Sequence, residues 1–268
     1  MTKNYSKGAY NLDLINKINQ YDLLILEKYY SEILSYFDPD KYVLEFWPGN
    51  LKWFQYLYSK WFRKFILVEI DEWFYLSQKE FLSIYKDVEV IHLHKNICDP
   101  DIFNNIDISQ VWLISSFQVI EHIEKSEFQS FIQKLYNSNY TWFLLFETIN
   151  AQNIIQWNFA IYHDDTHKLS FTPRSLKMIL TEIGDFDFKT TIWVWYPNII
   201  SIGSLFKYKI IPDKYLIFTF IFNTFYGFPY FLSKLISRFF LSRYISKNDK
   251  TFDAWFSIFF KITTNDNI

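Results

Sequence analysis

The chain has 268 residues, of which 50% are hydrophobic and 22% aromatic, and its formal net charge is −2. A chain of this length can bury a large core, and this composition excludes disordered and collagen-like proteins. The small net charge disfavours binding to nucleic acid through bulk electrostatics, so we expect no nucleic-acid partner. The single cysteine, Cys98, excludes a disulfide framework and a cysteine-based zinc site.

The first part of the chain, residues 1–40, is expected to form a helical lead-in. Apolar side chains recur at helical spacing between Leu14 and Phe37. The opening stretch MTKNYSKGAYNLDLINK has no apolar core after its basic residues, so we expect no secretory signal.

Residues 41–200 alternate short apolar strands with helical segments. The expected strands are YVLEF, FILVEID, VEVIHL, VWLISS and TWFLLFE, and the expected helices are Trp53 to Phe62, Trp73 to Tyr85 and Lys125 to Tyr136. This alternation predicts an α/β fold with a mostly parallel sheet and helices on both faces. In such sheets the ligand binds at the carboxyl ends of the strands, near the point where the strand order reverses.

A further helix and two further strands are expected after residue 150. The loop YHDDTHKLSFTP leads into a helix from Arg174 to Ile183, with Thr172 as N-cap, proline at the first helical position and Gly184 as the stop. The strands are FKTTIWVWY and AWFSIFFKI, and the second of them lies in residues 251–268, the final strand and tail.

Residues 201–250 form an apolar and basic insertion that is expected to be helical. The stretch from Tyr215 to Ser233 carries no charge, and a basic amphipathic stretch with Lys234, Arg238, Arg243 and Lys247 follows it. Three alternatives remain open for this insertion, including its basic part (215–247). These are helices packed on the domain or in a homodimer interface, an interfacial membrane contact, or a membrane span of minimal length.

The stretch LEFWPGNL combines a strand end, a tight turn and a helix start, the order in which a chain builds a nucleotide pocket. Glu45 ends the strand, and Pro48 and Gly49 form the bend. Such turns are usually rich in glycine, but here Trp47 and Leu51 stand on either side of Gly49.

With these stretches in place, the chain resembles the class I S-adenosylmethionine-dependent methyltransferases, and within them the branch of bacterial surface-polysaccharide biosynthesis. The resemblance covers about Tyr42 to Phe186. It is carried by LEFWPGNL, in which Trp47, Gly49 and Leu51 occupy the three glycine positions of the family, by SSFQVIEHI, by ETIN and by DDTHKLSFTPRSLKMILTEIGDF. It implies the Rossmann-like methyltransferase fold with a seven-stranded sheet and S-adenosyl-L-methionine as cofactor.

The resemblance also implies a set of cofactor-binding residues. Asp71 would accept hydrogen bonds from both ribose hydroxyls, and its alternative role is a solvated helix N-cap. Glu69 is the competing carboxylate, on the same side of the strand and more buried. The remaining members of the set are Glu45, Trp47 and Gly49 at the methionine end, Asn96 and Ile97 beside adenine, and Ser116.

Trp47 and Leu51 decide how far the pocket still works. An indole at a glycine position either fills the pocket or swings away from it. Leu51 costs less if its backbone lies in the helical region rather than at positive φ.

The resemblance places catalysis at Glu121, His122, Asp164 and His167. Histidine titrates near neutrality and suits a base that takes a proton from an acceptor hydroxyl. His167 is the first candidate base and His122 the second, with Asp164 or Glu121 orienting the ring. Glu121 would also contact the acceptor, and Asn150 would contact the acceptor or brace the loop. The alternative is a histidine that ties a loop to the sheet.

We expect no metal site, because the pair His92 and His94 offers too few ligands and Asp99 is not placed to join them. These two histidines are interpreted as structural.

The predicted function is O-methylation of a sugar or glycan hydroxyl by a cytoplasmic enzyme, which could contact the inner face of the membrane. Two alternatives stay open: an inactive methyltransferase-fold protein serving as a partner or scaffold, and a nicotinamide-dependent oxidoreductase, which leaves the VIEHI and DDTH stretches without a role.

Overall fold

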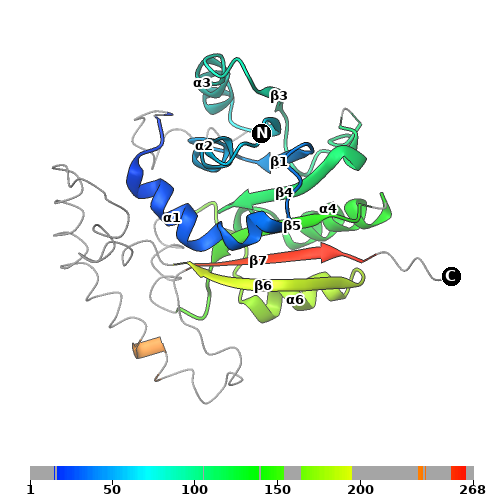
Figure 1. Ribbon diagram of the computed structural model, residues 1–268. Coiled ribbons are helices and arrows are strands. Elements are labelled where there is room, and N and C mark those ends of the chain that lie inside the picture. Colours follow the sequence, from blue (N-terminus) through cyan, green and yellow to red (C-terminus); the bar gives the residue numbers. More distant parts are fainter. Residues whose placement is uncertain are drawn as a thin grey trace.

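The protein, represented by a computed structural model, is built around one seven-stranded sheet (Figure 1). The structure describes residue 15 and residues 17–104, 106–138, 140–153, 164–194, 235–237, 239 and 255–263. The strands are β1 (Tyr42–Phe46), β2 (Lys64–Glu69), β3 (Glu89–His94), β4 (Val111–Phe117), β5 (Phe143–Ile149), β6 (Phe186–Val194) and β7 (Trp255–Ile262).

The strand order is β3-β2-β1-β4-β5-β7-β6. Strands β1 to β5 pair in parallel, and β7 runs antiparallel between β5 and β6, so its arrow opposes that of β6 in Figure 1. The order reverses between β1 and β4, and the carboxyl ends of these two strands are therefore the expected ligand site. The predicted mostly parallel seven-stranded sheet is confirmed.

Helices cover both faces of the sheet, as predicted (Figure 1). The described helices are α1 (Gln20–Tyr30), α2 (Lys52–Ser59), α3 (Glu72–Leu82), α4 (Lys125–Asn137) and α6 (Pro173–Thr181), with short 3-10 helices η2 (Glu32–Tyr36), η3 (Ile108–Gln110) and η4 (Ile120–His122). Helices α1 and α2 bury Tyr30, Trp53 and Phe54 in one apolar core. Helices α4 and α6 bury Phe128 and Leu176 in the other.

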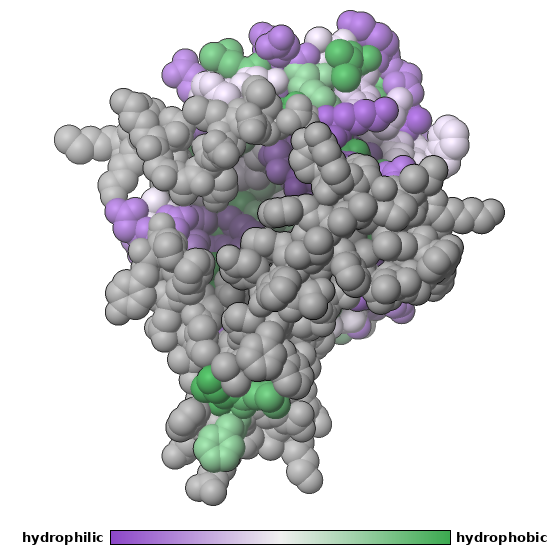
Figure 2. Space-filling model, turned by 90° about the vertical axis from the view of Figure 1, so that its left-hand side faces the viewer, coloured by the Kyte–Doolittle hydropathy of each residue, from purple (hydrophilic) through white to green (hydrophobic). Residues whose placement is uncertain are grey.

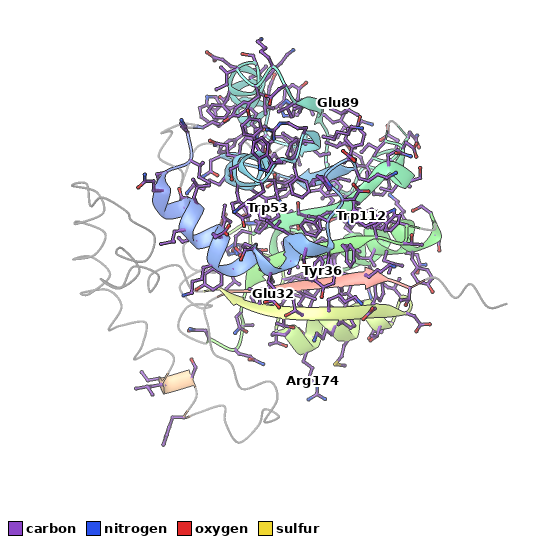
Figure 3. All side chains as sticks on the ribbon, in the orientation of Figure 1. Glu32, Tyr36, Trp53, Glu89, Trp112 and Arg174 are labelled. Carbon is purple, nitrogen blue, oxygen red and sulfur yellow. The ribbon has the colours of Figure 1, made fainter. Side chains whose placement is uncertain are left out.

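The lead-in helix is shorter than predicted. Asn19 caps α1, because its Oδ1 accepts from the backbone N–H of Asp22 at 2.8 Å, and the chain tightens into η2 after Tyr30. Residues 1–14 lie outside the described part of the chain. The indole N–H of Trp112 donates to the carbonyl of Tyr36 at 2.7 Å, which fastens η2 to β4 (Figure 3).

The predicted start of helix α6 is confirmed. Thr172 is its N-cap, with Oγ1 accepting from the backbone N–H of Ser175 at 3.0 Å, and Pro173 takes the first turn. The chain leaves α6 through Gly184, where an added Cβ would lie 2.3 Å from the ring of Tyr136. A glycine is needed here because the Tyr136 ring packs directly against the backbone, and not because the position has positive φ.

The insertion predicted at residues 201–250 lies almost entirely outside the described residues, which include only 235–237 and 239 of it. Leu235 and Phe239 are exposed by 46% and 78%, and hydrophobic colour dominates the coloured atoms on the lower part of the face in Figure 2. No helix in the described ranges has both the length and the apolar character needed to cross a bilayer. The structure therefore leaves the three alternatives for residues 215–247 as predictions.

Candidate cofactor and acceptor site

The turn after β1 has left-handed backbone at all three positions where the resembling family has glycine. The φ angles are 52° at Trp47, 49° at Gly49 and 60° at Leu51. Only glycine enters this region without a steric penalty, which for other residues is roughly 1–2 kcal/mol. Leu51 therefore has positive φ, the costlier of the two conformations considered from the sequence. The turn keeps the glycine-type conformation with larger side chains.

Hydrogen bonds and burial hold this strained turn. The N–H of Trp47 donates to the carbonyl of Val68 at 2.8 Å, and the N–H of Leu51 donates to that of Pro48 at 2.8 Å. The side chain of Leu51 is fully buried in the core beneath α2. Burying a leucine contributes about 1.5–3 kcal/mol, enough to offset the strain at this position.

The buried side chain of Gln78 ties the turn to β2 and β3. Its Nε2 donates to the carbonyl of Gly49 at 2.9 Å and to Glu69 Oε2 at 3.0 Å. Both amide protons are thus used, and Oε1 accepts from His92 Nε2 at 2.8 Å. The position of the Gly49 carbonyl therefore depends on a chain of side chains from three elements. Nothing in the sequence pattern singled out Gln78, because a polar residue on a helix is ordinarily exposed.

Two carboxylates lie beneath the turn. Glu45 is the last residue but one of β1 and has 4% of its surface exposed, and its Oε2 has no hydrogen-bond partner among the described residues. Burial, with a contribution from the charge of Glu69, raises the pKa of Glu45 to about 8. Glu69 is as buried as predicted, and its Oε1 accepts from the N–H groups of Ile70 and Asp71 at 2.9 and 3.0 Å.

Asp71 is at the carboxyl end of β2, where it was predicted to meet ribose. It is half-buried and caps α3, with Oδ1 accepting from the N–H of Phe74 at 3.0 Å. The helix N-cap considered from sequence is therefore present. A cap uses one acceptor site of a carboxylate that offers about four, so capping and ribose binding are compatible.

The remaining predicted cofactor residues follow β3 and β4. The side chain of Asn96 forms a local turn, with Oδ1 accepting from the N–H of Cys98 at 3.0 Å, and Ile97 is buried. Ser116 is fully buried in β4, and its Oγ has no partner within the described residues. All predicted cofactor residues thus lie on the turns or strand ends of β1 to β4.

The predicted catalytic residues His122, Asp164 and His167 lie close together near the indole of Trp47. The His122 ring lies 6.1 Å from the indole of Trp47 and 4.5 Å from the ring of His167, measured between centroids. His167 Nε2 lies 3.8 Å from Asp164 Oδ2, and the His167 side chain is only 8% exposed. The loop from 164 to 169 is fastened to η4, because the N–H groups of Lys168 and Leu169 donate to the carbonyl of Glu121 at 2.8 and 3.0 Å.

The protonation of His122 follows from its neighbours. Thr166 donates its hydroxyl proton to Asp164 Oδ1, so its oxygen accepts from His122 Nδ1 at 2.7 Å. Burial, and then the neighbouring His167, lower the pKa of His122 to about 4. His122 is therefore neutral, with the proton on Nδ1 and a lone pair on Nε2. For Asp164, burial raises the pKa, but the hydrogen bonds from Thr166 together with the neighbouring His122 and His167 leave the pKa below its ordinary value.

Glu121 is fully buried beside the two histidines. Its Oε2 accepts from Thr148 Oγ1 at 2.9 Å, and its Oε1 has no hydrogen-bond partner among the residues that the structure describes. Burial raises the pKa of Glu121 to about 8. Glu121, His122 and His167 each bring one ligand atom within 4.8 Å of the others. Spacing in the sequence does not show this, because His122 and His167 are 45 positions apart in the chain.

Asn150, predicted to contact the acceptor, is buried at the end of β5. Its Oδ1 accepts from the N–H of Gln152 at 3.0 Å, and its backbone bridges to Phe171. The position braces the loop, which is one of the two roles considered for it.

A polar group formed by Glu147, Gln118 and Tyr30 lies near the same strand ends, and of these three the sequence did not indicate Tyr30. The hydroxyl of Tyr30 donates to Glu147 Oε2, Gln118 Nε2 donates to Glu147 Oε1 at 3.2 Å, and Gln118 has a φ of 56°. Tyr30 also touches Trp53 edge to face, with ring centroids 5.3 Å apart. These contacts fasten α1 over the carboxyl ends of β4 and β5.

The chain matches no protein-family model and no curated protein. Among solved structures it is similar to a SAM-dependent methyltransferase from Archaeoglobus fulgidus, with a TM-score of 0.52, 15% identity and coverage of 91% of this chain and 100% of that one. The YcgJ protein from Bacillus subtilis gives a TM-score of 0.53 at 10% identity, with coverage of 92% and 100%.

A third similar structure is phosphoethanolamine N-methyltransferase 2 from Haemonchus contortus, bound to S-adenosylhomocysteine. The TM-score is 0.52 at 12% identity, covering 91% of this chain and 52% of that one. These likenesses establish that the chain has the Rossmann-like fold of class I methyltransferases. At such identities they establish the fold alone.

Proposed function

We propose that the protein is an S-adenosylmethionine-dependent methyltransferase. The observation that carries the proposal is the left-handed backbone at Trp47, Gly49 and Leu51, which keeps the glycine-type turn although two of the glycines are replaced. Strained backbone of this kind persists where the surrounding structure enforces it, and it is concentrated at ligand sites. The fold shared with known methyltransferases supports the same activity.

The residues below the turn fit such a cofactor. The buried Oε2 of Glu45 has no partner in the described structure and would be satisfied by the amino group of the methionine end. Asp71 would accept from the ribose hydroxyls, while Asn96 and Ile97 would lie beside adenine. The side chain of Ser116 offers a further buried hydroxyl.

When bound, S-adenosylmethionine supplies an activated methyl group that passes to the acceptor oxygen and leaves S-adenosylhomocysteine. The chain must remove one proton from that acceptor. His167 and His122 are the two candidate bases. Asp164 would orient the His122 ring through Thr166, and its Oδ2 lies 3.8 Å from His167 Nε2. Most of the acceleration would come from alignment of the reacting atoms, which the buried Glu121 and the braced Asn150 would help to set.

The acceptor we propose is a sugar or glycan hydroxyl in bacterial surface-polysaccharide biosynthesis. Its support is the resemblance of the stretches VIEHI and DDTHKLSFTP to that branch. A lipid-linked acceptor would bring residues 215–247 to the inner face of the membrane, and a homodimer interface is the other use of that segment. The solved neighbours include methyltransferases for unlike acceptors, such as phosphoethanolamine, so the acceptor needs a separate test.

An inactive methyltransferase-fold protein is the second candidate. The observation that favours it is the half-buried indole of Trp47, which packs against the core at a position where the resembling family has no side chain. In that case the fold would serve as a partner surface and the cofactor would not bind.

Calorimetry with S-adenosylhomocysteine separates the two candidates. We expect micromolar binding by the wild type and at least tenfold weaker binding by Asp71→Asn. Asparagine caps a helix as well as aspartate does, so this change keeps the start of α3 and removes the charge toward ribose. The matched control is Asp107→Asn, because Asp107 caps η3 in the same way, outside the site. Absence of binding in folded wild-type protein would favour the inactive scaffold.

A further inference from the structure

We propose that Glu121, His122 and His167 bind a divalent transition-metal cation of the zinc type at the acceptor end of the site. The three side chains bring one carboxylate oxygen and two imidazole nitrogens within 4.8 Å of one another. Two histidines and one carboxylate, with a remaining open position, are a ligand set that catalytic zinc and related cations use. The inference rests on the proposed function only for the chemical role of the cation.

The ligand atoms are prepared for a cation. Glu121 is fully buried, one of its oxygens is held by Thr148, and the other has no partner within the described residues. A buried carboxylate oxygen without a partner is costly, and a cation would satisfy it. Outside this cluster, the described residues contain no other group of three such ligands.

The groups behind the ligands resemble the outer shell of a metal site. His122 Nδ1 is bound to Thr166, which is bound to Asp164, so the Nε2 lone pair is fixed as the ligand atom. Metal-binding histidines commonly donate their other N–H to an oriented oxygen in this way. The backbone bonds from Lys168 and Leu169 to Glu121 hold His167 beside the other two ligands.

Binding requires a small contraction of the cluster. Bonds of 2.0–2.2 Å in a tetrahedral site place ligand atoms roughly 3.3 Å apart, so the widest pair must close by up to about 1.5 Å. Side-chain rotation can supply this movement, because η4 and the 164–169 loop are already tied together.

The cation would change the chemistry of the cluster. A lone pair that binds a cation cannot also take a proton, so in the loaded protein the histidines are ligands rather than bases. The open position would take the acceptor oxygen and lower the pKa of its hydroxyl. The hydroxyl proton would leave to solvent water, the new bond would join this oxygen to the methyl carbon, and the sulfur–carbon bond would break.

The test is cation binding by the full chain after removal of metals with a chelator. Zn²⁺ is titrated in a calorimeter, and Co²⁺ is followed by visible absorption. We expect one equivalent to bind, and at least tenfold weaker binding in Glu121→Gln and in His167→Ala. Thr166→Val should weaken binding by about 10–100-fold, and Thr166→Ser should restore it. The control His94→Ala removes an exposed histidine outside the cluster and should bind Zn²⁺ as the wild type does.

The outcomes separate this inference from the proposed function. The metal site is overturned if no cation binds, or if the wild type and both ligand variants bind it equally well. This holds whether or not S-adenosylhomocysteine binds. Cation binding that depends on these ligands supports it, even if S-adenosylhomocysteine fails to bind and the proposed function falls. Thermal unfolding of each variant is measured in parallel. If Glu121→Gln does not fold, the comparison of Thr166→Val with Thr166→Ser decides.

Discussion

At the scale of single residues, large side chains occupy backbone conformations that usually require glycine. Leu51 tolerates a φ of 60° because its side chain is fully buried, and Gly49 is held by the amide of Gln78. Trp47 has a φ of 52° and directs its indole toward His122, between the proposed cofactor and acceptor sides. Trp47, the residue that looked least compatible with a cofactor turn, therefore lies between the proposed cofactor-binding and acceptor-binding residues.

His92 gives a residue-scale prediction about pH. Burial, with smaller effects of Lys79 and His94, lowers the pKa of His92 to about 4. His92 donates its Nε2 proton to Gln78. Its buried Nδ1 has no hydrogen-bond partner among the described residues, so a second proton added there would have no acceptor. The unfolded chain titrates near 6.5, and it therefore binds more protons than the folded chain between about pH 6.5 and 4. The contribution of His92 to stability is complete above this window and is lost as the pH falls through it.

Urea unfolding of the wild type and His92→Gln at about pH 7 and about pH 5 checks this prediction. On going to the lower pH, the wild type should lose more unfolding free energy than His92→Gln does. The variant His94→Gln, on the same strand, controls for loss of an imidazole. A shift that is larger for the control than for His92→Gln would contradict the assignment.

At the scale of elements, caps set the helix boundaries. Asn19, Asp71 and Thr172 each accept from a backbone N–H in the first turn, and so start α1, α3 and α6. After α2 the chain reverses through Trp61, which has a φ of 73° and is 79% exposed. The periodicity of apolar residues showed that helices were present, and local polar contacts decided where they begin.

Thr172 carries the prediction at this scale. Thr172→Ala removes the acceptor for the Ser175 N–H and should lower the unfolding free energy by about 1 kcal/mol, whereas Thr172→Ser should retain most of it. Chemical denaturation measures both. Thr181→Ala, at the exposed end of the same helix, is the control and should change stability by less. Equal losses at both ends would indicate that the cap does not stabilise α6.

At the scale of the whole molecule, the last strand completes the sheet. Strand β7 inserts between β5 and β6, and its side chains Phe256, Ile258, Phe259, Phe260 and Ile262 are fully buried. Burial of five such side chains contributes roughly 8–15 kcal/mol. This is comparable to the entire stability of an ordinary domain, about 5–15 kcal/mol.

A chain that ends at residue 254 should therefore not fold. We expect it to be insoluble or to show no cooperative unfolding, because β5 and β6 would each lose a partner along a full edge. A chain that ends at Thr263 keeps all of β7 and should unfold as the full chain does. Calorimetric melting of the two truncated proteins compares them, and a cooperative transition in the shorter one would refute the prediction.

The sequence by itself determined the parallel sheet, the helices on both of its faces, the Thr172 cap and the turns that carry Glu45, Asp71 and Glu121. These follow from local periodicity and from the rule that ligands meet the carboxyl ends of parallel strands. Only the tertiary structure showed the left-handed backbone at Leu51, the buried bridge of Gln78, and the approach of His167 to Glu121. Such features depend on contacts between segments far apart in the chain, and no local pattern of residue types encodes them.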